Sequence, residues 1–190
     1  MFRDFVRSVA AVPSAFTIRR ATDADFEAMW SIFADIIATG DTYPFAPDTP
    51  KADALAYWAG PGVTSYVVEA EGRVVGMYKI VRNQPGLGSH VANASFMVAR
   101  SYSGKGAGRQ MGLDCLREAR RSGFRAMQFN FVVSTNTAAV ALWQSLGFAI
   151  VGTLPGVFRH KELGYVDAYV MYRSLEDIDL NPAPLTSQEA

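Results

Sequence analysis

Three glycines, Gly104, Gly106 and Gly108, alternate with other residues between a strand-like segment and a helix-like segment that begins near Arg109. Because glycine adopts backbone conformations closed to other residues, such a turn can direct successive N–H groups into one concavity. The following helix adds unpaired N–H groups and the positive end of its dipole. This arrangement binds phosphate or pyrophosphate, and Lys105 and Arg109 would add positive charge at its rim. The alternative is a glycine-rich turn that binds no ligand.

Two familiar nucleotide-binding motifs fit this turn poorly. A Walker loop places Ser or Thr after its lysine to reach magnesium, whereas Gly106 follows Lys105 here. A dinucleotide fingerprint requires an acidic residue about 20 residues further on, after the next strand. The next predicted strand, residues 126–133, contains no carboxylate and leads into Ser134-Thr135-Asn136. The sequence therefore disfavours both interpretations.

Two blocks of the chain have the spacing of one enzyme family. In the first, Val98 lies in a strand that runs into Gly106-Ala107-Gly108 and a helix, which resembles x-V-x-P followed by R/Q-x-x-G-x-G/A. The second block begins about 30 residues later and reads Asn136-x-x-Ala139-x-x-Leu142-Trp143-x-x-Leu146-Gly147-Phe148. It resembles a helix of the form N-x-x-A-x-x-L-Y-x-x-L-G-F. Over roughly residues 16–175, the chain is thus similar to the GNAT family, the acetyl-CoA-dependent N-acetyltransferases.

The resemblance implies the fold class and the domain organisation. It implies a single α/β domain over residues 16–175, preceded by an extension at 1–15 and followed by a tail at 176–190. The expected sheet is mixed and mostly antiparallel, with six or seven strands and helices on both faces. Because a helix connects the strands that contain Val98 and Val132, these strands should run parallel. In the family they splay into a V.

Local patterns place the elements that must position these residues. Strands are predicted at 16–20, 65–70, 73–81, 91–99, 126–133, 149–153 and 166–173, with a loop at 155–164 between the last two. Helices are predicted from about Asp23 to Gly40, at 51–58, at 109–121 and from Asn136. Thr22 with Asp25 resembles a capping box. Glycine followed by phenylalanine, at 123–124 and 147–148, is typical of a helix C-terminus.

The resemblance also implies how acetyl-CoA would be bound. The glycine turn would anchor the cofactor, a backbone N–H near Val98 would polarise the thioester carbonyl, and Asn136 would orient the cofactor. Asn136 is equally a natural helix N-cap. The expected cofactor-binding residues are Val98, Ser103, Gly104, Lys105, Gly106, Ala107, Gly108, Arg109, Asn136 and Trp143.

The acceptor side is indicated by asparagines on the two central strands. The Asn-x-x-Phe and Asn-x5-Asn spacings are similar to those of fungal acetyltransferases that act on azetidine-2-carboxylate and proline analogues. That similarity implies that Asn93 and Asn130 hold the acceptor, with Phe96 shaping its pocket. The candidate catalytic residues are Val98, Asn130 and Asn136. The proline-rich loop after the first helix supplies candidate pocket walls, Tyr43 and Phe45, which could equally be aromatic plugs of an ordinary loop.

A shared pocket for Asn93 and Phe96 has a geometric requirement. Residues three apart in a regular strand point to opposite faces. We therefore expect a β-bulge between Asn93 and Val98, which would turn Phe96 to the side of Asn93 and free a backbone N–H.

The sequence also departs from the family pattern. Trp143 stands where many relatives have a tyrosine that protonates the leaving thiolate, and an indole N–H cannot act as that acid near neutral pH. Arg100 and Ser103 replace the usual proline and the usual Arg or Gln. No carboxylate lies on the two central strands near the asparagines, so a water chain competes as proton acceptor with four acidic residues, Asp41, Glu69, Glu162 and Asp167.

Composition limits the classes of partner. The chain has 190 residues with 18 basic and 18 acidic side chains, so it lacks the charge excess typical of nucleic-acid or anionic-membrane binding. No apolar run approaches the ~18 residues of a membrane span. A single cysteine, Cys115, excludes an internal disulfide, favours the cytoplasm and is expected in the core. No metal site is expected.

These observations favour one function over two others. The favoured function is an acetyl-CoA-dependent N-acetyltransferase acting on a small-molecule amine, such as an amino acid or proline analogue. The alternatives are a transferase for protein or peptide amines and a non-catalytic acetyl-CoA-binding module. A homodimer is left open.

Overall fold

A seven-stranded sheet organises the computed structural model, which describes residues 16–180. The expected extension at 1–15 and residues 181–190 of the expected tail lie outside this range. The strands are β1 (Thr17–Arg20), β2 (Thr64–Ala70), β3 (Arg73–Arg82), β4 (Val91–Val98), β5 (Ala126–Val133), β6 (Ala149–His160) and β7 (Gly164–Ser174). The helices are α1 (Phe26–Ile37), α2 (Lys51–Ala59), α3 (Ala107–Arg121) and α4 (Thr137–Ser145).

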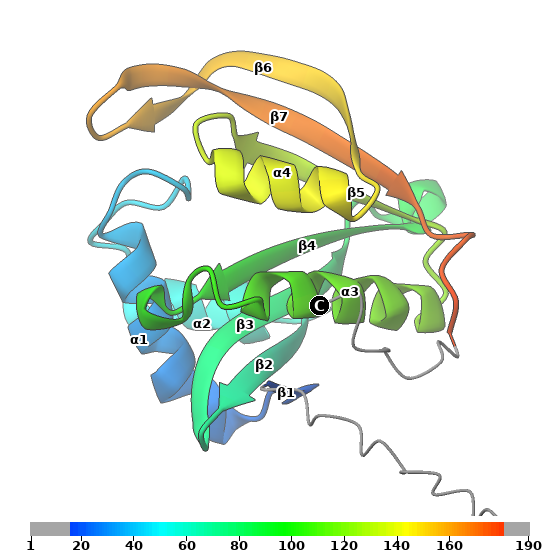
Figure 1. Cartoon of the computed structure of the whole chain (residues 1–190), viewed down its shortest axis with the longest axis horizontal. Helices are drawn as coiled ribbons and strands as arrows, with labels where there is room; N and C mark the ends of the chain where they lie inside the picture. Colours follow the sequence, from blue (N-terminus) through cyan, green and yellow to red (C-terminus); the bar gives the residue numbers. More distant parts are fainter. Residues whose placement is uncertain (1–15, 181–190) are drawn as a thin grey trace, which may run out of the picture.

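The order of the strands is β1-β2-β3-β4-β5-β7-β6, and every neighbouring pair is antiparallel except β4 and β5. This confirms the predicted mixed, mostly antiparallel sheet. The parallel pair is in register only at Val91 with Ala126 and Ala92 with Met127. Beyond that point β4 and β5 diverge, as Figure 1 shows, which confirms the predicted splay.

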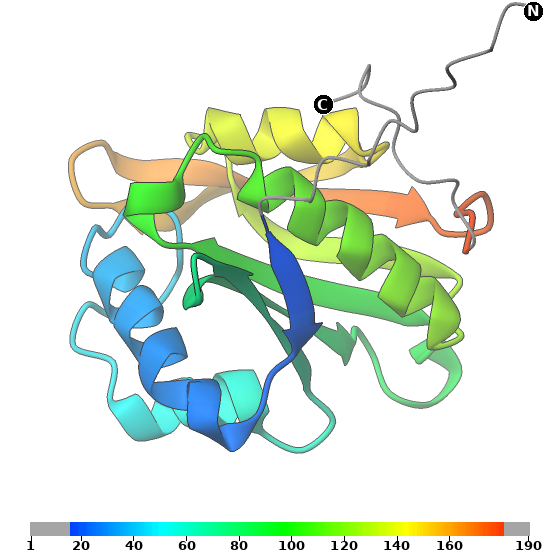
Figure 2. The same ribbon diagram turned by 60° about the horizontal axis from the view of Figure 1, so that its bottom comes forward.

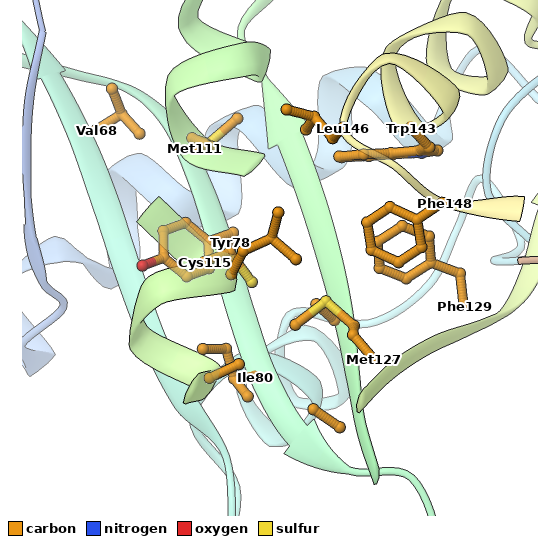
Figure 3. Close-up of a cluster of buried hydrophobic side chains, with 14 of the residues drawn as sticks. Val68, Tyr78, Ile80, Met111, Cys115, Met127, Phe129, Trp143, Leu146 and Phe148 are labelled. Carbon is orange, nitrogen blue, oxygen red and sulfur yellow. The ribbon is translucent and has the colours of Figure 1, made fainter. Parts of the chain in front are cut away.

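Helices cover both faces of the sheet, so two apolar cores form. In Figure 1, α3 crosses in front of the strands while α2 lies behind them. One core joins α1 and α2 to the sheet and includes Phe33, Trp58, Met77 and Met97. The other lies under α3 and α4 and includes Met111, Cys115, Phe129 and Trp143 (Figure 3). Cys115 is fully buried, as expected.

Helix ends follow the local signals with small shifts. Thr22 and Asp25 form the predicted capping box, but residues 23–25 make a 3₁₀ turn before α1 begins at Phe26. The glycines at both predicted C-termini have a positive φ of 87°, and the following N–H groups bond back into the helix, from Phe124 to Ala119 and from Phe148 to Trp143. None of the helices within residues 16–180 is long and apolar enough to span a bilayer.

The prediction of a loop at 155–164 was wrong. β6 continues to His160 and pairs with β7 in a long hairpin. Its pairing is irregular between Leu154 and Phe158, and this irregularity accommodates Pro155 because a bulge on an edge strand needs no N–H donor there. The hairpin reaches the loop that follows α1 (Figures 1 and 2), where the Lys161 N–H donates to the Gly40 carbonyl at 3.0 Å.

Candidate functional site

The divergence of β4 and β5 opens a cavity of about 230 Å³. The loop after α1, α2, the two strands and α4 all contribute to its wall. Residues predicted from the sequence that line it are Tyr43, Phe45, Asn93, Phe96, Asn130, Asn136 and Trp143. The structure thus brings together expected acceptor-side residues from three segments, the loop after α1, β4 and β5, with two expected cofactor-side residues of α4 and its N-cap.

The prediction of a β-bulge in β4 was wrong. β3 and β4 pair without interruption from Ala92 to Val98, so Asn93 and Phe96 lie on opposite faces of the sheet. Both nevertheless border the one cavity, because the cavity passes between the strands and meets both faces. The irregularity lies instead on β5, where two residues, Asn130 and Phe131, stand between the pairs that Phe129 and Val132 make with β7.

The edge of β4 that faces the cavity lacks a neighbouring strand. The Tyr43 hydroxyl takes the place of one, since it accepts from the Phe96 N–H at 3.0 Å and donates to the Phe96 carbonyl at 2.6 Å. Burial raises the pKa of Tyr43 well above its ordinary value, so the hydroxyl stays neutral. Because backbone groups alternate along a strand, the Val98 N–H points to the same edge as that of Phe96. A donor is therefore available where a carbonyl oxygen could be polarised.

The three predicted asparagines differ in their bonding. Asn93 accepts from the Ala94 N–H at 2.8 Å, which leaves its Nδ2 without a partner among residues 16–180. Asn130 is exposed, donates to Asn83 at 2.7 Å and accepts from Gln128 at 2.8 Å. Asn136 is the N-cap of α4 and accepts from the Ala139 N–H at 3.2 Å. Asn136 therefore acts as a helix N-cap, which was the alternative to a role in cofactor binding, and it also borders the cavity.

The glycine turn forms an open helix N-terminus. Gly104 and Gly106 have positive φ values of 74° and 88°, and no side chain caps α3 at Gly106. A Cβ at either glycine would have no atom within 4 Å, so the space beside the turn is free. The first N–H groups of α3 have no partner within the helix and suit an anion such as pyrophosphate. This geometry fits acetyl-CoA.

The side chains beside the turn are exposed or make contacts of their own. Ser103 and Lys105 are exposed, and the Lys105 ammonium lies 4.6 Å from the centre of the Tyr102 ring. Arg109 donates to the Ser145 hydroxyl of α4 at 3.3 Å. Ala107 is buried and anchors the start of α3.

Gly108 lies within α3 and serves helix packing. A Cβ there would lie 3.3 Å from Leu142 of α4, and one at Gly112 would overlap Leu146. The close approach of the two helices places Trp143 beside the cavity, with its ring centre 4.6 Å from that of Phe96 and 4.9 Å from that of Phe129. Figure 3 shows Trp143 next to Phe129 and Phe148 in this aromatic cluster.

No acidic or basic side chain lines the cavity among the described residues. The four candidate bases lie elsewhere: Asp41 accepts from Thr39, Glu69 pairs with Arg19, Asp167 accepts from the Gly156 N–H, and Glu162 is exposed. Within residues 16–180 no group of three His, Cys, Asp or Glu could hold a metal ion.

The sequence-based prediction missed Thr42 and, on other elements, a pair of polar residues of the cavity, Tyr57 and Ser95. Their hydroxyl oxygens lie 2.5 Å apart. Tyr57 lies in a predicted helix and Ser95 in a predicted strand, and no local pattern relates them, because their contact depends on how α2 packs on β4.

Comparison with known proteins agrees with this geometry. The acetyltransferase (GNAT) family profile matches residues 27–148. The fission yeast N-acetyltransferase aca1 is 36% identical over 121 residues, a match that covers 62% of this chain but only 58% of that protein. A GCN5-related N-acetyltransferase from Kribbella flavida is 44% identical, with a TM-score of 0.81 over 86% of this chain and 99% of that one. Salmonella typhimurium yncA, solved with its cofactor acetyl-CoA, is 27% identical, with a TM-score of 0.75 over 90% and 98% of the two chains.

Proposed function

Since this chain belongs to the acetyltransferase (GNAT) family, we propose that it transfers the acetyl group of acetyl-CoA to the amine of a small molecule, such as an amino acid or proline analogue. The observation that carries this proposal is the cavity between β4 and β5. Asn93 borders it, and β4 leads directly from it into the glycine turn that opens α3. An acceptor and an activated acetyl group can therefore meet along one strand.

On the cofactor side, backbone groups do the binding. The turn at Gly104 to Gly106 and the first N–H groups of α3 bind the pyrophosphate. The Val98 N–H donates to the thioester carbonyl, where negative charge develops as the amine attacks, and such a donor is worth about 3 kcal/mol. Acetyl-CoA supplies the acetyl group as a reactive thioester. The acetyl-CoA in the yncA structure supports this co-substrate.

On the acceptor side, the cavity is small and uncharged. Its volume of about 230 Å³ and its aromatic walls, Tyr43, Phe45 and Phe96, suit a compact molecule better than a peptide. The Nδ2 of Asn93 is available to a carboxylate or carbonyl oxygen of the acceptor. Asn130 lines the cavity from the opposite strand, β5, and its assigned role is to contact the acceptor with the N–H that Asn83 does not engage.

Proton transfer in this proposal relies on water. The lining contains no carboxylate, so the proton of the attacking amine passes to solvent through the cavity mouth. Trp143 offers an indole N–H that can donate a hydrogen bond but cannot protonate the leaving thiolate near neutral pH. The thiolate therefore takes its proton from water or from the acceptor ammonium.

The proposal is tested by incubating the protein with acetyl-CoA and a panel of amines. The panel contains L-proline, L-azetidine-2-carboxylate, phosphinothricin, methionine sulfoximine, a polyamine and a peptide. We expect release of free thiol with at least one small amino acid, together with its N-acetyl product by mass spectrometry. Calorimetric binding of acetyl-CoA without thiol release would favour a non-catalytic module, and release with the peptide alone would favour a peptide transferase.

A further inference from the structure

Three polar side chains form a row across the sheet beneath α2. Ser65 on β2 is in register with Lys79 on β3, and Lys79 is in register with Ser95 on β4. All three point into the face covered by α1 and α2, which is otherwise apolar. Lys79 is only 6% exposed. Burying an ammonium group costs free energy of folding unless neighbouring groups compensate its charge, so groups around Lys79 must stabilise it.

The compensation comes from the last turn of α2. The Lys79 ammonium donates to the Tyr57 carbonyl at 2.7 Å and lies 3.0 Å from the centre of the Tyr57 ring. Ser65 donates to the neighbouring Trp58 carbonyl. These carbonyls lack partners within the helix and form the negative end of its dipole. Among residues 16–180 no carboxylate pairs with Lys79, so its positive charge is offset by dipoles and by the ring faces of Tyr57 and Trp58.

This buried charge stands directly behind the cavity. Tyr57 and Ser95 both line the cavity, and their hydroxyls are hydrogen-bonded to one another. Whichever hydroxyl donates, the hydrogen of the other remains available to a ligand. The Nδ2 of Asn93, two residues from Ser95 on the same face of β4, is a further donor. The wall on this side therefore presents hydrogen-bond donors and a positive potential, with no acidic side chain.

We propose that the Tyr57–Ser95 hydroxyl pair, together with Asn93, binds a carboxylate of the acceptor, and that Lys79 is the positioning residue of this subsite. Lys79 holds the last turn of α2 on the sheet, which fixes the Tyr57 hydroxyl at Ser95, and its charge favours an anion there. The inference rests on the proposed function, and it narrows the acceptor to an amine that carries a carboxylate.

The charge of Lys79 gives the subsite a pH dependence. Burial lowers the pKa of Lys79 to about 8. The titratable groups that face it are Tyr57 from α2 and, beside Tyr57, Tyr43 from the loop after α1. Burial raises the pKa of both phenols, so Lys79 alone changes charge between pH 7 and 9. The subsite should therefore lose affinity for a carboxylate over this range.

The test compares two ligands that have no titratable amine, N-acetyl-L-proline and N-acetyl-L-prolinamide. Their binding to the full chain saturated with CoA is measured by calorimetry at pH 7 and pH 9. We expect the carboxylate to bind at least about tenfold more tightly than the amide at pH 7, because hydrogen bonds to charged groups are the stronger ones. This preference should shrink at pH 9.

Substitutions separate the roles of the residues. Tyr57→Phe and Lys79→Met should each reduce carboxylate affinity about tenfold and leave amide affinity within about twofold. Lys79→Met should abolish the pH dependence, and Lys79→Arg should restore the preference at both pH values. The control is Lys51→Met, which removes an exposed cation of α2 that pairs with Glu27 and should change nothing. If Lys79→Met does not fold, Tyr57→Phe, which keeps the ring, and Lys79→Arg decide the question.

Failure of the carboxylate subsite and failure of the proposed acetyl transfer give different results in the ligand comparison and the amine panel. Equal affinity for the two ligands, or binding of neither, in a protein that releases thiol with an amine would overturn the carboxylate subsite. An unchanged carboxylate preference in Tyr57→Phe would overturn the role of the hydroxyl pair, and a preference that still shrinks at pH 9 in Lys79→Arg would overturn the role of Lys79. Absence of thiol release with every amine would refute the proposed function, while the ligand comparison would still decide on the subsite.

Discussion

Asn93 shows how one side chain can serve both the fold and a ligand. Its carbonyl oxygen is engaged by the Ala94 N–H, which orients the amide and directs the Nδ2 away from that bond. The Nδ2 is therefore a pre-oriented donor at the wall of the cavity. In the proposed function this group contributes to acceptor binding without touching the cofactor.

Substitution of Asn93 tests this role. Asn93→Ala should raise the acceptor KM or lower kcat by about tenfold or more, because one hydrogen bond to a charged group is worth about 1.5–3 kcal/mol. Asn93→Asp retains the oxygen that bonds to Ala94 but removes the donor, so it should be at least as impaired. Steady-state kinetics and calorimetry with acetyl-CoA provide the measurement. A change in acetyl-CoA affinity of the same size would contradict an acceptor-side role.

Tyr43 has a structural task that its position in a proline-rich loop does not reveal. Its hydroxyl satisfies both backbone groups of Phe96 on the edge of β4 where no strand pairs. Tyr43→Phe should lower the free energy of unfolding by about 1–3 kcal/mol, because both groups lose their partner. Urea denaturation measures this, and Tyr165→Phe, at an exposed ring, is the control. Equal stability of the two variants would show that water replaces the hydroxyl without cost.

At the scale of elements, the glycines at the start of α3 serve two purposes, an open turn and a close contact with α4. The glycine pattern in the sequence does not show which glycine serves which purpose. Gly106 has a positive φ and faces open space, which suits a ligand-binding turn. Gly108 and Gly112 face α4 and allow the two helices to approach closely. The alternating glycines therefore form in part a turn whose open space suits a ligand and in part a packing contact between two helices.

Valine substitutions distinguish these two tasks. Gly106→Val should weaken acetyl-CoA binding more than tenfold, because its side chain enters the space beside the turn and strains the left-handed backbone. Gly108→Val should lower the free energy of unfolding by about 1–3 kcal/mol through overlap with Leu142. Calorimetry and urea denaturation measure the two effects. Gly72→Val, at a hairpin glycine with φ of 72° and free space, controls for backbone strain, and an equal loss of cofactor affinity there would refute the assignment.

At the scale of the whole molecule, the buried Lys79 links stability to pH. Its pKa is lowered from 10.5 to about 8 in the folded protein, so the unfolded chain binds more protons between pH 8 and 10.5. The free energy of unfolding therefore rises with pH across that window. Below pH 8 the buried ammonium destabilises the folded protein to its full extent. Burial raises the pKa of Cys115, which acts in the opposite direction as the unfolded thiol ionises.

The difference between wild type and Lys79→Met isolates this linkage, since Cys115 is present in both. The free energy of unfolding of wild type relative to the variant should increase by about 1–3 kcal/mol from pH 7.5 to 9.5. Urea denaturation at the two pH values measures it, with Lys51→Met as control. A constant difference would mean that Lys79 has an ordinary pKa and is open to water.

The outer edge of the sheet bears on oligomeric state. β6 is an edge strand, and apolar side chains such as Val151 and Val157 are 58% and 46% exposed on it. Exposed apolar side chains on an edge strand favour association. A homodimer remains a prediction, which sedimentation equilibrium tests, and a Val151→Lys variant should dissociate it. A monomer at all concentrations, for wild type as well, would contradict it.

Features that depend on near neighbours in the chain could be predicted from the sequence. The capping box at Thr22, the glycine C-termini and the turn at Gly106 follow from local backbone geometry. The parallel pairing of β4 and β5 follows from the helix that connects them. The candidates Asn93, Phe96 and Asn130 came from the family resemblance, and all three line the cavity.

Features that depend on how elements meet required the tertiary structure. Alternation along β4 indicates that Asn93 and Phe96 face opposite sides, but only the divergence of β5 makes both border one cavity. The Tyr57–Ser95 pair and the buried Lys79 arise from the packing of α2 on three strands whose register no local pattern specifies. Side-chain period and capping are short-range properties of the chain, whereas a cavity and a buried charge are set by long-range packing, and this is why only the fold locates them.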